Sequence, residues 1–261
     1  MTDAPAPTGA LAPFAPIAPF VPDTAFAVPG RIVPSNRAAA RWQPARIAAI
    51  RRETPRATTF RLALSRWTPH APGQHYMVRL TAPDGYTATR HYSVASPPED
   101  EGFIELTVGH VAGGEVSGHL HTAARPGDTV EVRGPLGGFF AWPGDRPALL
   151  LGAGTGVVPL MAMVRHHRRR GLSVPLRLIV SARTREDLLY ADEYGAETTA
   201  VLTRTAGRLS AAHVSPYLRG GEQAADWEAY VCGGNGFAEH ASRILVDGGQ
   251  PVNRIRIERF G

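Results

Sequence analysis

The pattern of apolar residues changes near residues 140–146, and this change limits the possible folds more than any other feature of the sequence. Before it, apolar and polar residues alternate in short runs separated by glycine, proline and aspartate. After it, continuous apolar runs alternate with segments whose apolar residues recur at the spacing of a helix. The sequence therefore predicts an all-strand domain followed by an α/β domain.

The first domain, which we assign to residues 41–143, contains six predicted strands. One short helical segment, residues 116–124, is expected between the fifth strand and the sixth. Six such strands favour a closed or nearly closed antiparallel barrel, because closure removes exposed strand edges. The strand sequences are ARIAAIRR, TTFRLAL, HYMVRLTA, TRHYSVA, FIELTVGH and DTVEVRG.

The second domain, assigned to residues 144–261, contains the predicted strands ALLLGAG, LRLIVSA, TTAVLTR, AYVCGG and IRIERF. The first is apolar throughout, as expected for a strand covered on both faces. Helices are predicted between the strands, at residues 157–171, 185–194, 210–218 and 237–249. This alternation predicts a doubly wound sheet of five parallel strands.

The remaining residues, 1–40, are rich in alanine and proline, and we expect them to form a disordered tail. An acid near the start and frequent prolines argue against a secretory signal, and no apolar run is long enough to span a membrane. The single cysteine, Cys232, excludes an internal disulfide and a four-cysteine cluster. We therefore expect a cytoplasmic protein without a metal site.

The formal net charge of +5 suits acidic partners, whether nucleic acid, phosphorylated cofactors or an acidic protein. No paired Cys/His finger and no aromatic RNA-binding signature accompanies the charge, so we do not expect nucleic-acid binding. The densest basic run, residues 165–170, is predicted to end a helix. There its cations would complement the helix dipole and stay solvated.

A glycine-rich turn, GAGTGVVP, joins the first strand of the second domain to its helix. Glycines let backbone N–H groups approach a phosphate, and a helix N-terminus favours negative charge. A tight turn needs glycine in any case, but the strand–turn–helix context favours phosphate binding. The candidate residues are Gly152, Gly154, Thr155, Gly156 and Pro159.

A second glycine pair, Gly113 and Gly114, precedes Val116 and Ser117 at the short helix of the first domain. Exposed N–H groups and a hydroxyl could again hold an anion. Ser117 could equally serve only to cap its own helix, and these residues alone do not decide between the two roles.

Taken in order, these segments resemble the ferredoxin–NADP reductase-like flavoenzymes, in which a flavin-binding barrel precedes a nicotinamide-binding α/β domain. The resemblance covers roughly residues 42–261. The segments on which the resemblance rests are PGQ (72–74), RHYS (90–93), GGEVS (113–117), GP (134–135), GAGTGVVP (152–159), CG (232–233) and ERF (258–260).

The resemblance implies that the RHYS strand binds FAD. Arg90 would pair with the pyrophosphate, Tyr92 would pack against the flavin ring, and Ser93 would reach the N5 edge as a catalytic residue. His91 belongs to this segment, but its side chain is expected to point away. The residues that would hold the FAD phosphates at the short helix are Gly113, Gly114, Val116 and Ser117.

The resemblance also implies that the glycine-rich turn takes the pyrophosphate of NAD(P)H. Cys232 and Gly233 would lie beside the nicotinamide, although a lone cysteine is also commonly a small buried hydrophobe. The loop after them lacks the proline of the family, so we expect it to be more flexible. Cys232 and Glu258 are expected to be catalytic, and Phe260 to cover the flavin, although it could instead pack into the core.

Four residues lie at or just beyond predicted strand ends, where the resemblance puts the adenosine ribose. No acid ends the second strand of this domain, so we favour NADPH over NADH. Surface arginines that cap strand ends would explain the same residues. They are Ser181, Arg183, Arg204 and Arg208.

The expected activity is an FAD-dependent NAD(P)H oxidoreductase that passes single electrons to a separate acceptor. Because one cysteine leaves no fused cluster, the acceptor would be an acidic redox protein (a ferredoxin, a flavodoxin or an oxygenase component) or a small molecule. The alternative is a non-catalytic flavin- or nucleotide-binding subunit of a larger oxidoreductase complex. The loosened loop after Gly233 and the trailing Gly261 would favour that alternative.

Overall fold

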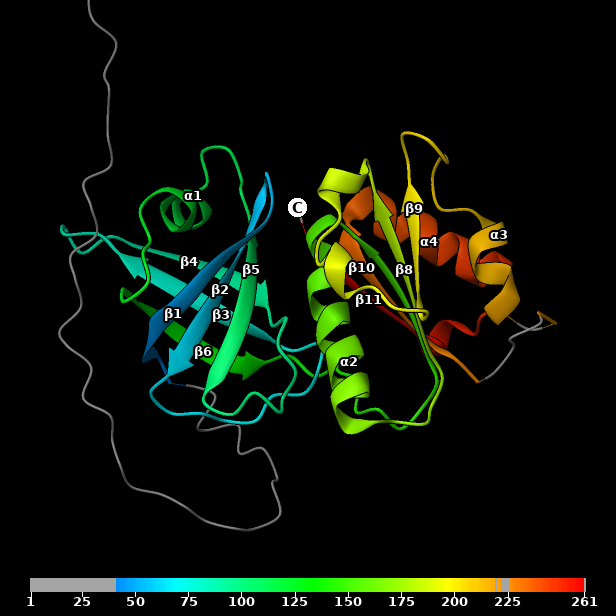
Figure 1. Ribbon diagram of the computed structural model, residues 1–261, viewed down its shortest axis with the longest axis horizontal. Helices are drawn as coiled ribbons and strands as arrows, with labels where there is room; N and C mark the ends of the chain where they lie inside the picture. The colour runs from blue at the N-terminus through cyan, green and yellow to red at the C-terminus, as the bar shows by residue number, and fades with distance from the viewer. Residues whose placement is uncertain (1–40, 219, 222–225, 261) are drawn as a thin grey trace, which may run out of the picture.

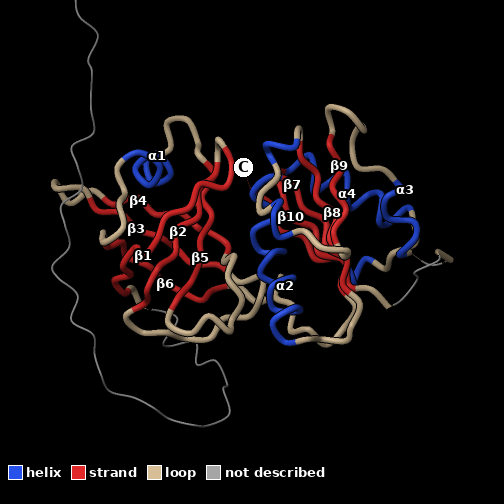
Figure 2. Tube along the Cα trace, viewed as in Figure 1, coloured by secondary structure: helices blue, strands red, loops and turns tan. Residues whose placement is uncertain are grey.

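The computed structural model describes residues 41–218, 220–221 and 226–260, which form two domains side by side (Figure 1, Figure 2). The predicted tail, residues 1–40, lies outside the described residues. None of the described helices is both long enough and apolar enough to cross a membrane.

Six antiparallel strands form the first sheet, in the order β4-β3-β6-β1-β2-β5. A bridge between Val94 and Leu106 joins its two outer edges, so the predicted barrel is confirmed. α1 (Glu115–Thr122) follows β5 in the chain. The strands are β1 (Gln43–Thr54), β2 (Ala57–Leu64), β3 (His75–Thr81), β4 (Thr87–Ser93), β5 (Phe103–Gly109) and β6 (Thr129–Leu136).

Side chains along β3 show why these segments form strands. Tyr76, Val78 and Leu80 are buried in the barrel, and the residues between them are only half-buried. Because successive side chains of a strand point to opposite faces, this alternation fixes which face packs into the core.

Five parallel strands form the second sheet, in the order β11-β10-β7-β8-β9, and confirm the predicted doubly wound fold. Leu149, Leu150 and Leu151 of the central strand β7 are fully buried, because both faces of the sheet are covered. The strands are β7 (Ala148–Ala153), β8 (Leu176–Ala182), β9 (Thr198–Leu202), β10 (Glu228–Gly234) and β11 (Ile255–Phe260).

Helices cover both faces of this sheet (Figure 1). α2 (Val157–Arg170) packs on the face that carries Leu150. α4 (Asn235–Asp247) and the short α3 (Ala211–Val214) pack on the face that carries Leu149. The α/β domain is therefore a three-layer sandwich with α2 on the side of the barrel.

The prediction of a helix over residues 185–194 is wrong. Two 3₁₀ turns, Arg185–Asp187 and Ala191–Glu193, replace it. Tyr190 separates them with a φ of 59°, which a right-handed helix does not allow. Its ring is buried and its hydroxyl hydrogen-bonds Thr107 of the barrel, so packing between the domains overrides the helical pattern.

The helix predicted over residues 210–218 is also shorter than expected. α3 ends at Val214, and a 3₁₀ turn, Ser215–Tyr217, follows it. Pro216 lies inside this turn and has no backbone N–H to continue the hydrogen bonds of the helix.

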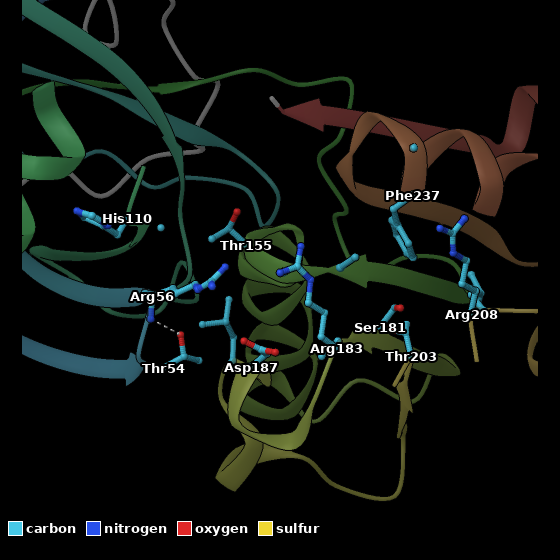
Figure 3. Close-up of a pocket in the computed structure, with 18 of the residues that line it drawn as sticks. Thr54, Arg56, His110, Thr155, Ser181, Arg183, Asp187, Thr203, Arg208 and Phe237 are labelled. Carbon is cyan, nitrogen blue, oxygen red and sulfur yellow. Dashed lines mark hydrogen bonds between the residues drawn. The ribbon is translucent and has the colours of Figure 1, made fainter. Parts of the chain in front are cut away.

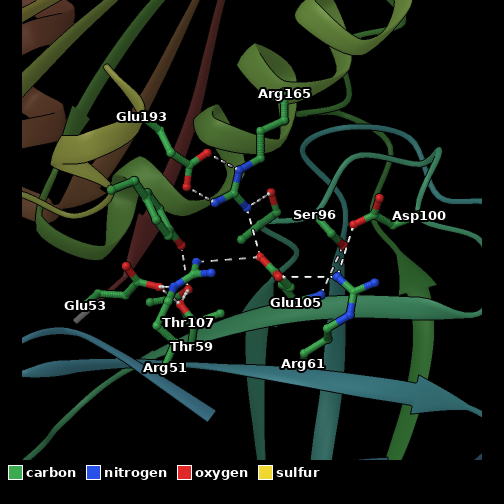
Figure 4. A network of polar contacts seen from close by, with 12 residues as sticks. Arg51, Glu53, Thr59, Arg61, Ser96, Asp100, Glu105, Thr107, Arg165 and Glu193 are labelled. Atoms are coloured by element: carbon green, nitrogen blue, oxygen red, sulfur yellow. Dashed lines mark hydrogen bonds and ion pairs between the residues drawn. The ribbon is translucent and has the colours of Figure 1, made fainter. Parts of the chain in front are cut away.

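The basic run at residues 165–170 contributes to the interface between the domains, and the prediction that it stays solvated is wrong for Arg165. This side chain is only 13% exposed. Its Nη1 lies 3.0 Å from Oε2 of Glu105 on β5, and its Nε lies 2.9 Å from Oε2 of Glu193 (Figure 4). Further pairs across the interface are Arg169 with Asp100 and His166 with Glu99. α2 lies against the barrel, so all three side chains meet acids, although Arg169 remains largely exposed.

Candidate functional site

The end of β5 meets the glycine-rich turn where the two domains face each other. A Cβ placed on Gly109 would lie 3.0 Å from Cγ2 of Thr155. The chain continues from Gly109 through His110 and Val111 to the start of α1. The glycine-rich segments of both domains therefore begin at one boundary.

A cleft of about 670 Å³ opens at this boundary (Figure 3). Five of the predicted residues line it: Gly154, Thr155, Ser181, Arg183 and Arg208. Residues that the sequence interpretation missed line it too, among them Thr54, Arg56, Gly109 and His110 from the barrel and Asp187, Phe237 and His240 from the α/β domain. No local motif marks these positions, because only the packing of two domains brings them together.

Three other members of the glycine-rich turn serve packing. A Cβ on Gly156 would overlap the carbonyl oxygen of Cys232, so only glycine lets the turn approach β10. A Cβ on Gly152 would lie 2.9 Å from Cδ1 of Leu160. Pro159 is buried in the first turn of α2. These residues hold the turn in place without lining the cleft.

Gly154 and Thr155 present the turn to the cleft. Gly154 has a φ of 55°, in the region that favours glycine. No described side chain caps the 3₁₀ turn at residues 154–156 or the α2 helix that follows it. Backbone N–H groups at this end can therefore bind an anion.

The arginines of the cleft differ from those of the domain interface. Arg56, Arg183 and Arg208 form no ion pair within the described parts of the chain, unlike the arginines of the domain interface. Asp187 is the acid among the described lining residues, and its carboxylate accepts hydrogen bonds from the backbone N–H and hydroxyl of Thr184. Three arginines against one aspartate leave the cleft with a charge of +2, which suits a ligand with several phosphates.

Arg204 differs from the other predicted ribose residues. Its backbone N–H donates to the carbonyl of Arg183 at 3.1 Å, but its side chain is outside the lining of the cleft. Thr203, the residue before it, does line the cleft and adds a hydroxyl beside Ser181 and Arg208 (Figure 3).

On the barrel, β4 brings Arg90 to the first turn of α1. The Arg90 Nη2 lies 3.8 Å from Oε2 of Glu115, and the arginine remains largely exposed. Tyr92 is half-buried against the barrel core, and burial raises the pKa of its hydroxyl to about 12. Ser93 ends the strand, half-buried. His91 is exposed, with its ring 5.1 Å from that of His75.

The start of α1 is built around glycine. Gly113 has a φ of 71°, and Gly114 precedes the helix in an extended conformation without a side-chain cap. A Cβ on Gly114 would meet the Ser117 hydroxyl, which accepts a hydrogen bond from the Val111 N–H at 3.3 Å. Val116 is buried. Ser117 thus holds the preceding loop, and the helix N–H groups remain available to an anion.

Cys232 and Glu258 are register partners on β10 and β11. Cys232 is fully buried within the core beneath α2, and burial raises the pKa of its thiol. Burial also raises the pKa of Glu258, whose Oε2 has no hydrogen-bond partner among the described residues. Phe260, at the end of β11, is 36% exposed and is not part of the core. β11 ends between the two domains (Figure 1).

Residues 44–140 match the model of the oxidoreductase FAD-binding domain. The chain is similar to the ferredoxin–NADP reductase-like flavoenzymes over both of its domains. Ferredoxin–NADP reductase B of Sorangium cellulosum is 37% identical over 152 residues, which cover 57% of this chain and 62% of that protein. An NADPH oxidoreductase of Mycobacterium tuberculosis is 30% identical, over 82% of this chain and 59% of that protein.

Solved structures of ferredoxin–NADP reductase-like proteins share the fold. The Amycolatopsis cytochrome P450 reductase GcoB matches 84% of this chain and 70% of its own, with a TM-score of 0.71 and 26% identity. Phthalate dioxygenase reductase matches 84% of this chain and 68% of its own, with a TM-score of 0.69 and 20% identity. The chain spans 52% to 62% of the length of the first curated relatives it matches.

The residues present fit the two nucleotides that this family uses. Arg90 and the uncapped start of α1 form one anion-binding corner on the barrel. The cleft, with its glycine-rich turn and charge of +2, forms a second one on the α/β domain. Near the end of β11, Glu258 adds a buried carboxyl oxygen that has no hydrogen-bond partner in the described part of the chain.

Proposed function

We propose that this chain is an FAD-dependent NAD(P)H oxidoreductase that delivers electrons to a separate acceptor. One observation carries the proposal: the FAD-binding barrel and the uncapped glycine-rich turn meet at a single cationic cleft. The proposal includes a flavin domain at residues 41–143, a nucleotide domain at residues 144–261 and a cytoplasmic location.

The barrel residues would bind and orient FAD. When bound, FAD supplies the chemistry that lets the protein accept a hydride and deliver single electrons. Arg90 and the N–H groups of α1 would hold the pyrophosphate. Tyr92, fixed by its packing on the barrel core, would support the ring, and Ser93 would donate a hydrogen bond to its edge.

The α/β residues would bind NAD(P)H with the nicotinamide toward the barrel. Gly154 and Thr155 would take the pyrophosphate, and Ser181 and Arg208 a 2′-phosphate, which makes NADPH the preferred nucleotide. Catalysis by such a site is mostly orientation, because two rings must be aligned in a space that excludes water.

Three residues at the strand ends would complete the site. Cys232, packed beneath α2, would limit how deeply the nicotinamide enters. Glu258 would bind a proton more readily than an ordinary glutamate, since burial raises its pKa. Phe260, exposed at the end of β11, would cover the ring.

The acceptor would be an acidic redox protein. Relatives of this chain include a toluate 1,2-dioxygenase electron transfer component and a ferredoxin–NADP reductase. The net charge of +5 supports association with an acidic partner such as a ferredoxin, a flavodoxin or an oxygenase component.

Anaerobic rapid mixing with NADPH and with NADH, followed by flavin absorbance, tests the proposal. Both nucleotides are expected to bleach the flavin, NADPH faster. A flavin-loaded chain that neither nucleotide bleaches would be the non-catalytic subunit instead.

A further inference from the structure

Arg56 belongs to the barrel domain but lines the cleft of the α/β domain. It lies in the two-residue turn between β1, which ends at Thr54, and β2, which begins at Ala57. Figure 3 shows its guanidinium directed toward Thr155 and Arg183, at the end of the cleft that holds the glycine-rich turn.

The turn that carries Arg56 is held from both sides. The Arg56 N–H donates to the Thr54 hydroxyl at 3.2 Å, and the Arg56 carbonyl accepts from the His110 N–H at 2.7 Å. Ala57 is buried in the core cluster that lies beneath α2. The backbone of this turn is therefore fixed at the domain interface, and only the side chain is free to meet a ligand.

The charges of the cleft are divided between its two ends. Arg56 and Arg183, one from each domain, lie at the end with Thr155 (Figure 3). Arg208 lies at the other end, near Phe237, with an aromatic ring and hydroxyls around it. Two cations beside an uncapped turn match a pyrophosphate, whereas one cation beside an aromatic ring matches an adenosine end.

We propose that Arg56 binds the pyrophosphate of the dinucleotide together with Arg183 and the glycine-rich turn. This inference rests on the proposed function and adds a binding residue from the flavin domain to the nucleotide site. A ligand with two phosphates would engage both domains, and a ligand with one phosphate would engage the α/β domain alone. Arg56 would thereby select dinucleotides over mononucleotides.

Calorimetric titration of the flavin-loaded full chain with ADP-ribose, AMP and NADP⁺ tests the inference. For Arg56→Ala, we expect the Kd of ADP-ribose and of NADP⁺ to rise about 10-fold, while that of AMP changes by less than about 2-fold. Arg56→Lys keeps the charge but loses the fork geometry, so its loss should be intermediate.

Arg46→Ala is the matched control, because Arg46 is an exposed arginine on β1 that does not line the cleft. It should bind all three ligands as the wild type does, and the flavin content of every variant should be equal. An unchanged Kd of ADP-ribose in Arg56→Ala, or an equal loss for AMP and ADP-ribose, would overturn the inference. A wild type that binds NADP⁺ but is not reduced by NADPH would defeat the proposed function alone.

Discussion

At the scale of single residues, the arginines of the domain interface differ from those of the cleft. Arg165 and Arg169 are paired with acids between the domains. Arg56, Arg183 and Arg208 line the cleft and form no ion pair with a described acid. A paired guanidinium is neutralised, but an unpaired one in a concave site concentrates anions there, so the second group marks the ligand site.

Arg90→Ala should weaken flavin binding about 10-fold, because it removes a charge-assisted contact to phosphate. The ratio of flavin to protein absorbance after dilution or dialysis measures the loss. Arg46→Ala, on the same sheet, is the control and should retain its flavin. Equal retention by Arg90→Ala would count against the assignment of Arg90.

Arg208→Ala should lower the ratio of kcat/KM for NADPH to that for NADH by about 10-fold, because it removes a cation from the adenosine end of the cleft. Steady-state kinetics with both nucleotides gives the ratio. Arg204→Ala makes the same change outside the lining of the cleft, so it should leave the ratio unchanged. Similar effects of the two variants would show that Arg208 has no special role.

Glu258→Gln should gain stability over the wild type as the pH rises from acid to neutral. Below the ordinary carboxyl pKa of about 4.3, Glu258 is protonated in both the folded and the unfolded chain. As the pH rises through its elevated folded pKa, the wild type must ionise a buried carboxyl and loses stability that the glutamine variant keeps. Melting temperatures measured from pH 4 to 8 test this; a difference between the two proteins that does not vary with pH would contradict it.

The site could be predicted from the sequence where its residues form a local pattern or lie near predicted strand ends, as Ser181, Arg183 and Arg208 do. The RHYS strand and the glycine-rich turn are local patterns, and the structure brings Arg90 to α1 and Thr155 to the cleft. Arg56 and Phe237 gave no signal, because a turn arginine and a helix phenylalanine acquire a role only when domains pack. Arg204 fits the local pattern and still lies outside the cleft lining.

At the scale of elements, α2 has two functions. Its first turn follows the glycine-rich turn at the cleft, and its last turns hold the barrel through Arg165. One rigid helix thus connects the nucleotide end of the α/β domain to the domain interface. The position of the barrel against the glycine-rich turn depends on this connection.

Arg165→Ala should destabilise the chain by about 3 kcal/mol, since removing one partner of a buried pair leaves carboxylates uncompensated. Arg168→Ala, on the same helix, removes a partly exposed pair with Glu197 and should cost less than about 1 kcal/mol. Denaturant unfolding of both variants gives the comparison. Equal losses would mean that the interface network contributes no more than a surface pair.

The elements were predictable where their periodicity reflects one buried face. The strands and α2 were confirmed because alternation and helical spacing match the faces they bury. The segment at residues 185–194 has helical spacing too, but its buried leucines and Tyr190 lie between two 3₁₀ turns, and the Tyr190 hydroxyl hydrogen-bonds Thr107 of the barrel. A local pattern cannot report a partner that comes from the other domain.

At the scale of the whole molecule, two domains, each proposed to bind one nucleotide, meet at one cleft. The barrel presents its anion-binding corner at α1, and the α/β domain presents its own at the start of α2. The network at Arg165 fixes their arrangement. Alignment of two cofactors by a rigid interface is the physical basis of the activity proposed here.

The most direct test of that activity is an anaerobic titration of the flavin-loaded chain with NADPH, followed by a one-electron acceptor such as ferricyanide. We expect about one equivalent of NADPH to bleach the flavin, and about two equivalents of ferricyanide to restore its colour. A flavin that stays oxidised with both NADPH and NADH, in a chain that retains it tightly, would contradict the account.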